Sequence, residues 1–189
     1  MLPPMATTPR PGLDDALRLG RRRFLAGERL DMSSLADELG VNRVTLHRWI
    51  RSRDKLLVEV VWSLTERTLA IAERDANGRG PEWVTQVLTD FMDMVITNSG
   101  MQRWLADEGE HAMRLLTRHE TEFQPRLIAA VEEILCRDGD AGHPEAPVDL
   151  HELAFVIVRV IESYIYLDLI TGEQPVASRA EPILRRLLG

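Results

Sequence analysis

The sequence predicts an all-α protein with a small three-helix part at the N-terminus and a larger helical part behind it. Apolar residues recur at helical spacing from residue 13 onward, and no segment shows the strict alternation of a half-buried strand. The hydrophobic fraction of 44% is enough for a core, and 189 residues can hold a small domain fused to a larger one. We place the divisions at 1–12, 13–57 and 58–189.

The chain begins with twelve residues that contain four prolines and little that a core could bury, so we expect 1–12 to be a disordered arm. A helix is predicted from Leu13 to Ala26. One side of it is apolar, with Leu13, Leu17, Gly20, Phe24 and Leu25, and another side is basic, with Arg18, Arg21, Arg22 and Arg23. We expect the apolar side to brace the segment that follows.

Residues 30–57 carry the signals of two short helices joined by a tight turn. Asp31 and Asn42 stand where helix N-caps are wanted, and Ser52 can cap a third helix. Gly40 can adopt the left-handed conformation that ends a helix. The inward positions are apolar: Met32, Leu35, Ala36, Leu39, Val41, Leu46 and Ile50.

Two short helices around a glycine-containing turn form a helix-turn-helix, whose second helix can enter the major groove of DNA. The outward residues of that helix suit this task, because Arg43 can bond guanine at two atoms and Val44 can meet a thymine methyl. Thr45 can contact a base or a phosphate, and His47 and Arg48 also look outward. The alternative is a plain helical hairpin inside an all-α core.

The stretch LADELGVNRVTLHRWIRSRDKLL, residues 35–57, resembles the DNA-binding motif of the TetR family of transcriptional regulators, IAxxAGVSxxTLYxHFxSKxxLL. The resemblance implies an N-terminal helix-turn-helix DNA-binding domain at 13–57 and a C-terminal ligand-binding and dimerisation domain at 58–189. Carried over by position, it places the DNA contacts on Ser33, Arg43, Val44, Thr45, His47, Arg48 and Arg53.

Three positions depart from the family pattern. His47 stands where a phosphate-contacting Tyr is usual, which makes that contact weaker or sensitive to pH. Trp49 replaces the usual His or Tyr. Arg53 replaces Lys and could grip one phosphate with two bonds.

The formal net charge of −7 is unevenly distributed. Residues 1–55 hold 11 basic and 7 acidic side chains, whereas the rest of the chain holds 12 and 23. Phosphate attraction is local, because charges are screened over about 8 Å at physiological salt. The basic part therefore coincides with the predicted DNA-binding motif. A solvated face explains most of the arginines of 13–26, although one or two could reach the DNA backbone.

Further helices are predicted at 53–76, 82–97, 102–118 with a kink point at Gly109, 121–136, 150–170 and 178–188. The first of them begins beside the DNA and ends in the next domain, so a movement of this helix could be transmitted from one domain to the other. The stretch 77–81, Asn-Gly-Arg-Gly-Pro, breaks the chain after it. Residues 137–147 have the composition of a surface loop.

Helix 150–170 is apolar on more than one side, so its own domain cannot cover it completely. In TetR-like proteins the last two helices form a four-helix interface with a second subunit, which implies a homodimer through 150–170 and 178–188. Two recognition helices roughly 34 to 36 Å apart would match successive major grooves of a double-stranded palindromic operator.

The second domain is interpreted as a small-molecule sensor, because adaptable apolar groups with a few polar ones are usual in ligand sites. The candidate ligand-binding residues are Trp83, Phe91, Met94, Trp104, His111, Met113, Phe123, Arg159, Glu162 and Tyr166. The expected inducer is largely apolar with a small polar head, such as an acyl chain, a lactone or an aromatic. Each of these residues could instead belong to the core or the surface. Arg159 and Glu162 lie one helical turn apart and can pair with each other or with a ligand head.

The leading hypothesis is a dimeric, ligand-responsive repressor. A second is a DNA-binding regulator controlled by a protein partner or constitutively active, without a small-molecule pocket. An enzyme is not expected, since no catalytic constellation is visible. The histidines show no metal-ligand spacing, the single Cys136 excludes an internal disulfide, and no cofactor is expected. The N-terminus has no signal-peptide layout and no run is long enough to cross a membrane, so we expect a cytoplasmic protein.

Overall fold

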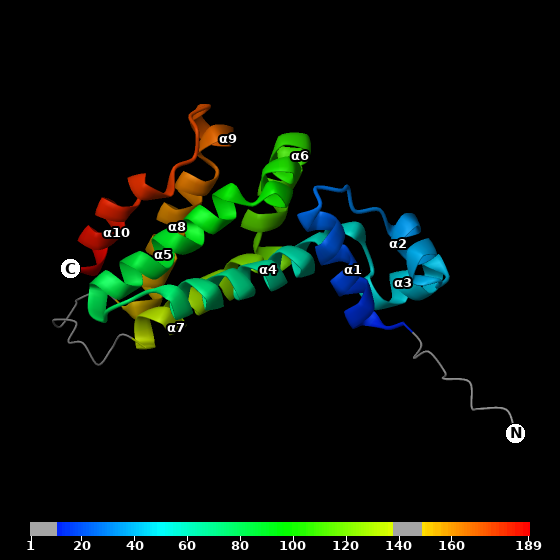
Figure 1. The fold of residues 1–189 in the computed structure, drawn as a ribbon, viewed down its shortest axis with the longest axis horizontal. Coiled ribbons are helices and arrows are strands. Elements are labelled where there is room, and N and C mark those ends of the chain that lie inside the picture. The colour runs from blue at the N-terminus through cyan, green and yellow to red at the C-terminus, as the bar shows by residue number, and fades with distance from the viewer. Residues whose placement is uncertain (1–10, 138–148) are drawn as a thin grey trace, which may run out of the picture.

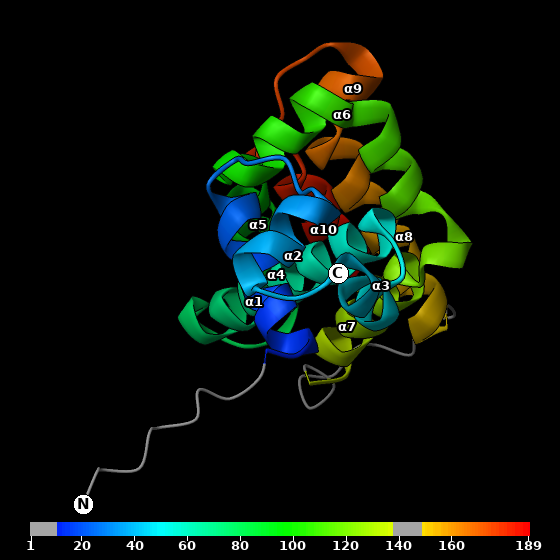
Figure 2. The ribbon, with the colours of Figure 1, turned by 90° about the vertical axis from the view of Figure 1, so that its right-hand side faces the viewer.

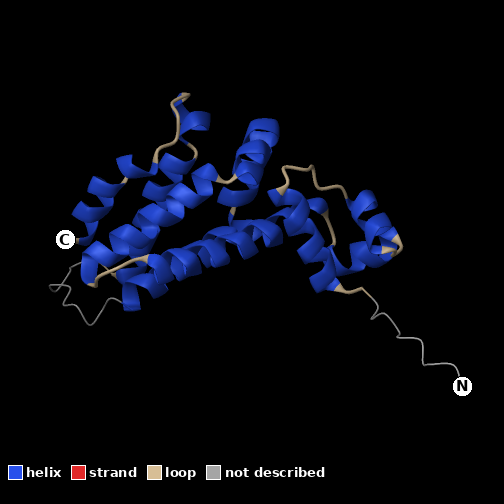
Figure 3. Cartoon of the chain, in the orientation of Figure 1, coloured by secondary structure: helices blue, strands red, loops and turns tan. Residues whose placement is uncertain are grey.

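The computed structural model describes residues 11–137 and 149–189, and every regular element in these ranges is a helix (Figure 3). The elements are α1 (Leu13–Leu25), α2 (Met32–Leu39), α3 (Arg43–Ile50), α4 (Arg53–Asp75), α5 (Gly80–Thr97), α6 (Ser99–Thr117), the 3-10 turn η1 (His119–Thr121), α7 (Phe123–Arg137), α8 (Leu150–Ile165), α9 (Leu167–Thr171), the 3-10 turn η3 (Ala177–Arg179) and α10 (Glu181–Leu188). The predicted all-α fold is confirmed. The expected arm lies outside the described residues up to residue 10, and the expected loop lies outside them from 138.

The helices form two groups that share α4 (Figure 1). Helices α1, α2 and α3 gather at one end, and α5, α7, α8 and α10 gather at the other. Helix α4 runs from the first group into the second, with α6 rising near its middle. Seen end-on from the small group, α2 and α3 lie nearest the viewer (Figure 2). A displacement of α4 would therefore be felt in both groups.

The small group is specified by local signals. The Asp31 carboxylate accepts from the backbone N–H of Ser33 at 3.0 Å and of Ser34 at 2.9 Å, and caps α2. Asn42 Oδ1 accepts from the N–H of Val44 at 2.9 Å and caps α3. Gly40 ends α2 with a φ of 64°, a left-handed conformation that suits glycine. These caps fix where each helix begins and ends.

The core of the small group contains the predicted apolar positions. Leu35 and Leu46 are completely buried and Ile50 is nearly so, whereas Met32 and Leu39 pack against them from partly buried positions. Burial of such side chains stabilises the fold by about 1.5 to 3 kcal/mol each. The helices of this group are therefore held by their shared apolar faces.

The structure differs from the predicted elements at two breaks. Helix α6 is kinked at Glu108, where φ is −139° and ψ is 35°, and not at its neighbour Gly109. The helix expected over 150–170 is divided at Tyr166, whose carbonyl accepts from the N–H groups of Leu169 and Ile170, both at 3.1 Å. The run of apolar residues is continuous across this point, so its periodicity gave no sign of the break.

The last helix also begins later than predicted, at Glu181 and not at residue 178, because η3 occupies 177–179. Within the described ranges, no helix has both the length and the apolar character needed to cross a bilayer.

Candidate DNA-binding face and ligand cavity

One face of α3 is exposed while the opposite face is buried. Arg43, Val44, His47 and Arg48 are exposed, and Thr45 is half-buried. Val44 is 75% exposed, the largest exposed fraction among the large hydrophobic residues that remain at the surface. An apolar side chain that the fold leaves uncovered beside two arginines suits contact with a groove that offers both phosphates and thymine methyl groups.

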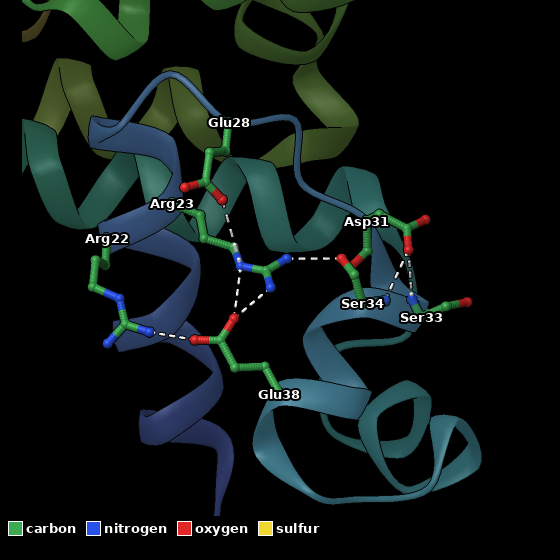
Figure 4. A network of polar contacts seen from close by, with 7 residues as sticks. All are labelled: Arg22, Arg23, Glu28, Asp31, Ser33, Ser34 and Glu38. Carbon is green, nitrogen blue, oxygen red and sulfur yellow. Dashed lines mark hydrogen bonds and ion pairs between the residues drawn. The ribbon is translucent and has the colours of Figure 1, made fainter.

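Two arginines of α1, Arg22 and Arg23, are engaged within the protein (Figure 4). The Glu38 carboxylate of α2 accepts from both Arg22 and Arg23, and Arg23 also donates to Ser34 Oγ at 2.7 Å. The hydrogen bond from Arg23 is the main cause that lowers the pKa of Glu38. Arg18 pairs with Asp15 in the same way. The contacts of Arg22 and Arg23 hold α1 against α2, and all three ion pairs together neutralise much of the basic side of α1.

Arg43 and Arg48 contrast with Arg18, Arg22 and Arg23 of α1, because neither forms an ion pair with another described residue. The exposed face of α3 therefore carries two positive charges that no described carboxylate compensates. Ser33 is half-buried in the first turn of α2, where its N–H is held by Asp31. Its contact with DNA stays a prediction.

Arg53 was predicted to contact a phosphate, and in this structure its guanidinium is bound within the protein. Its guanidinium donates to Glu108 Oε2 at 2.8 Å from Nη1 and to Oε1 at 2.6 Å from Nη2, and Nε donates to the Leu30 carbonyl at 2.7 Å. The forked grip that we expected on a phosphate is closed on a carboxylate instead. The hydrogen bond from Arg53 is also the main cause that lowers the pKa of Glu108.

His111 was predicted to bind ligand. It lies instead at the junction of α4 and α6, outside the cavity that is described below. Its Nε2 is 3.0 Å from Asp54 Oδ1, and its Nδ1 is 2.9 Å from Arg114 Nη2. Asp54 follows Arg53 on α4, and His111 follows Glu108 by one turn on α6. Two adjacent polar contacts therefore connect the beginning of α4 with α6.

A mostly apolar cavity of about 60 Å³ lies between α1, α4, α5, α6, α7 and α8. Five of the ten predicted ligand-binding residues line it: Phe91, Met94, Phe123, Glu162 and Tyr166. Its other walls are Phe24, Val61, Leu64, Thr65, Thr68, Val95, Asn98, Met101, Leu116, Leu127, Ile161 and Ile165. The structure thus brings half of the predicted set together.

Of the five that do not line it, His111 lies at the junction of α4 and α6, and the other four are distributed as follows. Trp104 packs edge-on against Phe24, with ring centroids 5.7 Å apart, and Met113 packs against the core from a partly buried position. Trp83 lines an open surface groove of about 1120 Å³ between α4, α5 and α7. Arg159 borders the cavity without lining it. Their spacing on the helices matched that of the lining residues, so periodicity alone could not separate the two sets.

A polar cluster closes one side of the cavity. Glu162 is 8% exposed, and its carboxylate accepts from the Gln124 amide and from Arg159 Nη2, the latter at 3.0 Å. Arg159 also donates to the Gln124 carbonyl oxygen. Burial is the main cause that raises the pKa of Glu162. The charged pair expected from the sequence is thus present, with Gln124 as a third member.

Two residues of this region were not predicted. Phe24 was assigned to bracing the helix-turn-helix, but it also forms a wall of the cavity. Gln124 is 6% exposed, and a polar residue on the apolar face of 123–135 could have identified it as a buried hydrogen-bonding group.

The last helices expose apolar side chains that no other described part of the chain covers. Those on α8, α9, the following loop and α10 are Phe155, Val156, Leu169, Ile170, Val176, Ile183 and Leu187, each between 36% and 59% exposed. Exposed apolar side chains that gather in one patch are typical of association sites, and α8 and α10 each contribute two of these residues.

Comparison with known proteins agrees with this arrangement. Residues 79–189, more than half of the chain, match the family description "Tetracyclin repressor-like, C-terminal domain". A solved structure, that of the R. erythropolis transcriptional repressor QsdR from the TetR family, is 30% identical, with 94% of each chain covered and a TM-score of 0.84. The crystal structure of AibR in complex with isovaleryl coenzyme A and operator DNA is 17% identical over 93% of this chain and 95% of that one. Its TM-score is 0.41. No curated protein matches the sequence. The family match and the likeness to QsdR, together with the helix-turn-helix, establish that this chain belongs to the TetR family of transcriptional regulators.

Proposed function

We propose that this chain is a ligand-responsive repressor, which binds a palindromic operator as a homodimer and is released by a small, largely apolar inducer. The observation that carries the DNA-binding half is the exposed face of α3, where Arg43 and Arg48 form no ion pair with a described residue and Val44 is 75% exposed. The sign of regulation is proposed from the likeness to QsdR, which is described as a repressor.

The homodimer is supported by the exposed apolar surface of α8 and α10. A second copy that covered this surface with its own α8 and α10 would form a symmetric four-helix interface. Such a dimer would present two copies of α3, which two successive major grooves of a palindrome require.

The release mechanism is supported by the size and the walls of the cavity. A volume of about 60 Å³ is far below the roughly 300 to 1,000 Å³ that ligand pockets usually offer. An inducer must therefore displace the walls, and these include Phe24 of α1 and Leu64 and Thr68 of α4. Both helices belong to or lead into the DNA-binding group, so a conformer that admits ligand also shifts α3. Coupling of this type is typically about 1 to 3 kcal/mol, a 5- to 150-fold loss of operator affinity.

The small cavity also favours a second candidate. A DNA-binding regulator that is controlled by a protein partner, or constitutively active, would need no larger space. Operator binding measured with and without apolar small molecules separates the two, since only the sensor loses affinity when ligand is added.

The DNA-binding role is tested by operator affinity in Arg43→Ala and Arg48→Ala variants. Each is expected to lose about 1 to 3 kcal/mol if the guanidinium bonds a base edge at two atoms. Arg18→Ala is the matched control, because it removes one exposed arginine that is paired with Asp15. Equal losses in all three variants would show that only overall charge matters and would exclude a specific α3 contact.

A further inference from the structure

The polar groups that line the cavity define what kind of ligand it can take. Glu162 is the single charged residue among the lining side chains, and Thr65, Thr68, Asn98 and Tyr166 are the polar ones beside it. Because the remaining walls are apolar, a ligand finds its polar contacts among these residues or leaves its own polar atoms unpaired.

The charge of Glu162 is already compensated inside the protein. One carboxylate oxygen accepts from Gln124, and the other accepts from Arg159 at 3.0 Å. A ligand cation would therefore meet a carboxylate that is already paired, and the positive charge of Arg159, 3.0 Å from that carboxylate, would repel it. A ligand anion would meet that carboxylate with no unpaired lining cation to offset the repulsion. Placing either charge in an apolar cavity without a partner is costly.

Three of the lining groups have donor hydrogens that are not used within the protein. The Tyr166 residue is 4% exposed and Thr65 is 6% exposed, and neither hydroxyl forms a hydrogen bond with another described residue. Thr68 is different, because its hydroxyl donates a hydrogen bond to the Leu64 carbonyl at 2.8 Å. Asn98 uses its carbonyl oxygen to accept from the Met101 N–H at 2.9 Å, which leaves its amide N–H groups unused.

Tyr166 is the strongest of these donors. Burial raises the pKa of its hydroxyl above the ordinary value, so the phenol keeps its proton at any physiological pH. It also sits at the break between α8 and α9, one turn from Glu162, at the polar side of the cavity. A nearly buried hydroxyl without a partner in the protein is a group that a ligand can satisfy.

We propose that the cavity takes an uncharged, largely apolar molecule with a carbonyl oxygen, which accepts a hydrogen bond from the Tyr166 hydroxyl while its hydrocarbon part lies against Phe91, Met94 and Phe123. This inference rests on the proposed sensor function and narrows its ligand. It selects neutral ketones and esters and rejects carboxylates and amines of the same chain length.

The test compares three probes of equal chain length, 2-hexanone, hexanoate and hexylamine, by calorimetric titration of the full-length protein at pH 7. We expect 2-hexanone to bind at least tenfold more tightly than either charged probe. Hexanoate or hexylamine binding as tightly as the ketone would overturn the ligand class, while the sensor function would stand. Binding of none of the three up to their solubility would overturn the ligand class and the sensor together.

The assignment of Tyr166 is tested with Tyr166→Phe, which removes the hydroxyl and keeps the ring. Loss of one net hydrogen bond should weaken 2-hexanone binding about 2- to 10-fold and leave hexylamine binding unchanged. Tyr164→Phe is the matched control, since Tyr164 lies two residues earlier, in the last turn of α8, and does not line the cavity. Unaltered ketone affinity in Tyr166→Phe would overturn the assignment.

A parallel operator-binding measurement keeps the two proposals apart. Ketone binding that leaves operator affinity unchanged supports the ligand class and contradicts the release mechanism. Loss of operator affinity on addition of 2-hexanone, reduced in Tyr166→Phe, supports both.

Discussion

The Arg53 guanidinium closes a two-bond fork on the Glu108 carboxylate, with N···O distances of 2.8 and 2.6 Å. Arg53 is the first residue of α4, and Glu108 is the kinked residue of α6. This contact therefore joins the start of α4, beside the small group of α1, α2 and α3, to α6. A third hydrogen bond, from Nε to the Leu30 carbonyl, holds the segment before α2 to the same arginine. The contact therefore fixes α6, α4 and the entry to the helix-turn-helix relative to one another.

Glu108→Gln is expected to release Arg53 toward DNA phosphate. One additional phosphate contact should steepen the dependence of log affinity on log salt concentration by about 0.9. The measurement is a salt titration of operator binding by fluorescence anisotropy. Asp107→Asn is the matched control, because it removes one negative charge from the adjacent residue, whose partner is Arg103 and not Arg53. An identical slope in both variants would show that Arg53 stays away from DNA.

The same pair predicts a dependence of stability on pH. Hydrogen bonding from Arg53 lowers the pKa of Glu108 below its ordinary value of 4.5 in the folded state. The stabilisation is therefore complete above pH 4.5 and is lost as the pH falls through the folded-state pKa. Urea unfolding should show the wild type more stable than Glu108→Gln by about 1 to 3 kcal/mol at pH 7. This difference should shrink toward pH 3, and a difference that grows in acid would contradict the assignment.

Gly100 marks a close approach of α6 to α1. A Cβ at this position would lie 2.2 Å from the Phe24 carbonyl oxygen, which is backbone and cannot turn aside. We expect Gly100→Ala to lower the free energy of unfolding by about 1 to 3 kcal/mol, although alanine favours helix. At Gly109 of the same helix, a Cβ would meet only the end of the Leu169 side chain, at 3.0 Å. Gly109→Ala should therefore cost clearly less in denaturant unfolding, and equal losses would contradict the proposed contact.

Dimerisation through α8 and α10 is tested by placing charges on their exposed apolar side chains. Phe155 and Ile183 are 42% and 41% exposed, and a double Asp variant should sediment as a monomer at concentrations where the wild type is a dimer. Leu13→Asp is the control, because Leu13 is 44% exposed but lies on α1. A double variant that stays dimeric would place the interface elsewhere.

The parts of the fold that local chemistry determines were predictable from the sequence. Asp31, Asn42 and Ser52 cap the helices at which they were expected, because a cap involves only a side chain and N–H groups two or three residues away. Leu46 and Ile50 are buried as their spacing predicted.

The contacts that define the site were less predictable because they join distant parts of the chain. Arg53 and Glu108 are 55 residues apart, and no local pattern shows that their side chains meet. Phe24 lines the cavity for the same reason, since its position depends on how α1 rests on Gly100. The break at Tyr166 could not be predicted, because no glycine or proline lies at or beside it in the sequence.

In the proposed complex, two copies of α3 enter successive major grooves of one palindrome. Selection of bound duplexes from a random pool with the full-length protein, followed by sedimentation of the complex, tests this arrangement most directly. We expect an enriched palindrome whose half-sites lie roughly 34 to 36 Å apart, bound by two chains and lost in Arg43→Ala. Enrichment of no sequence, or one chain on each bound duplex, would contradict this arrangement.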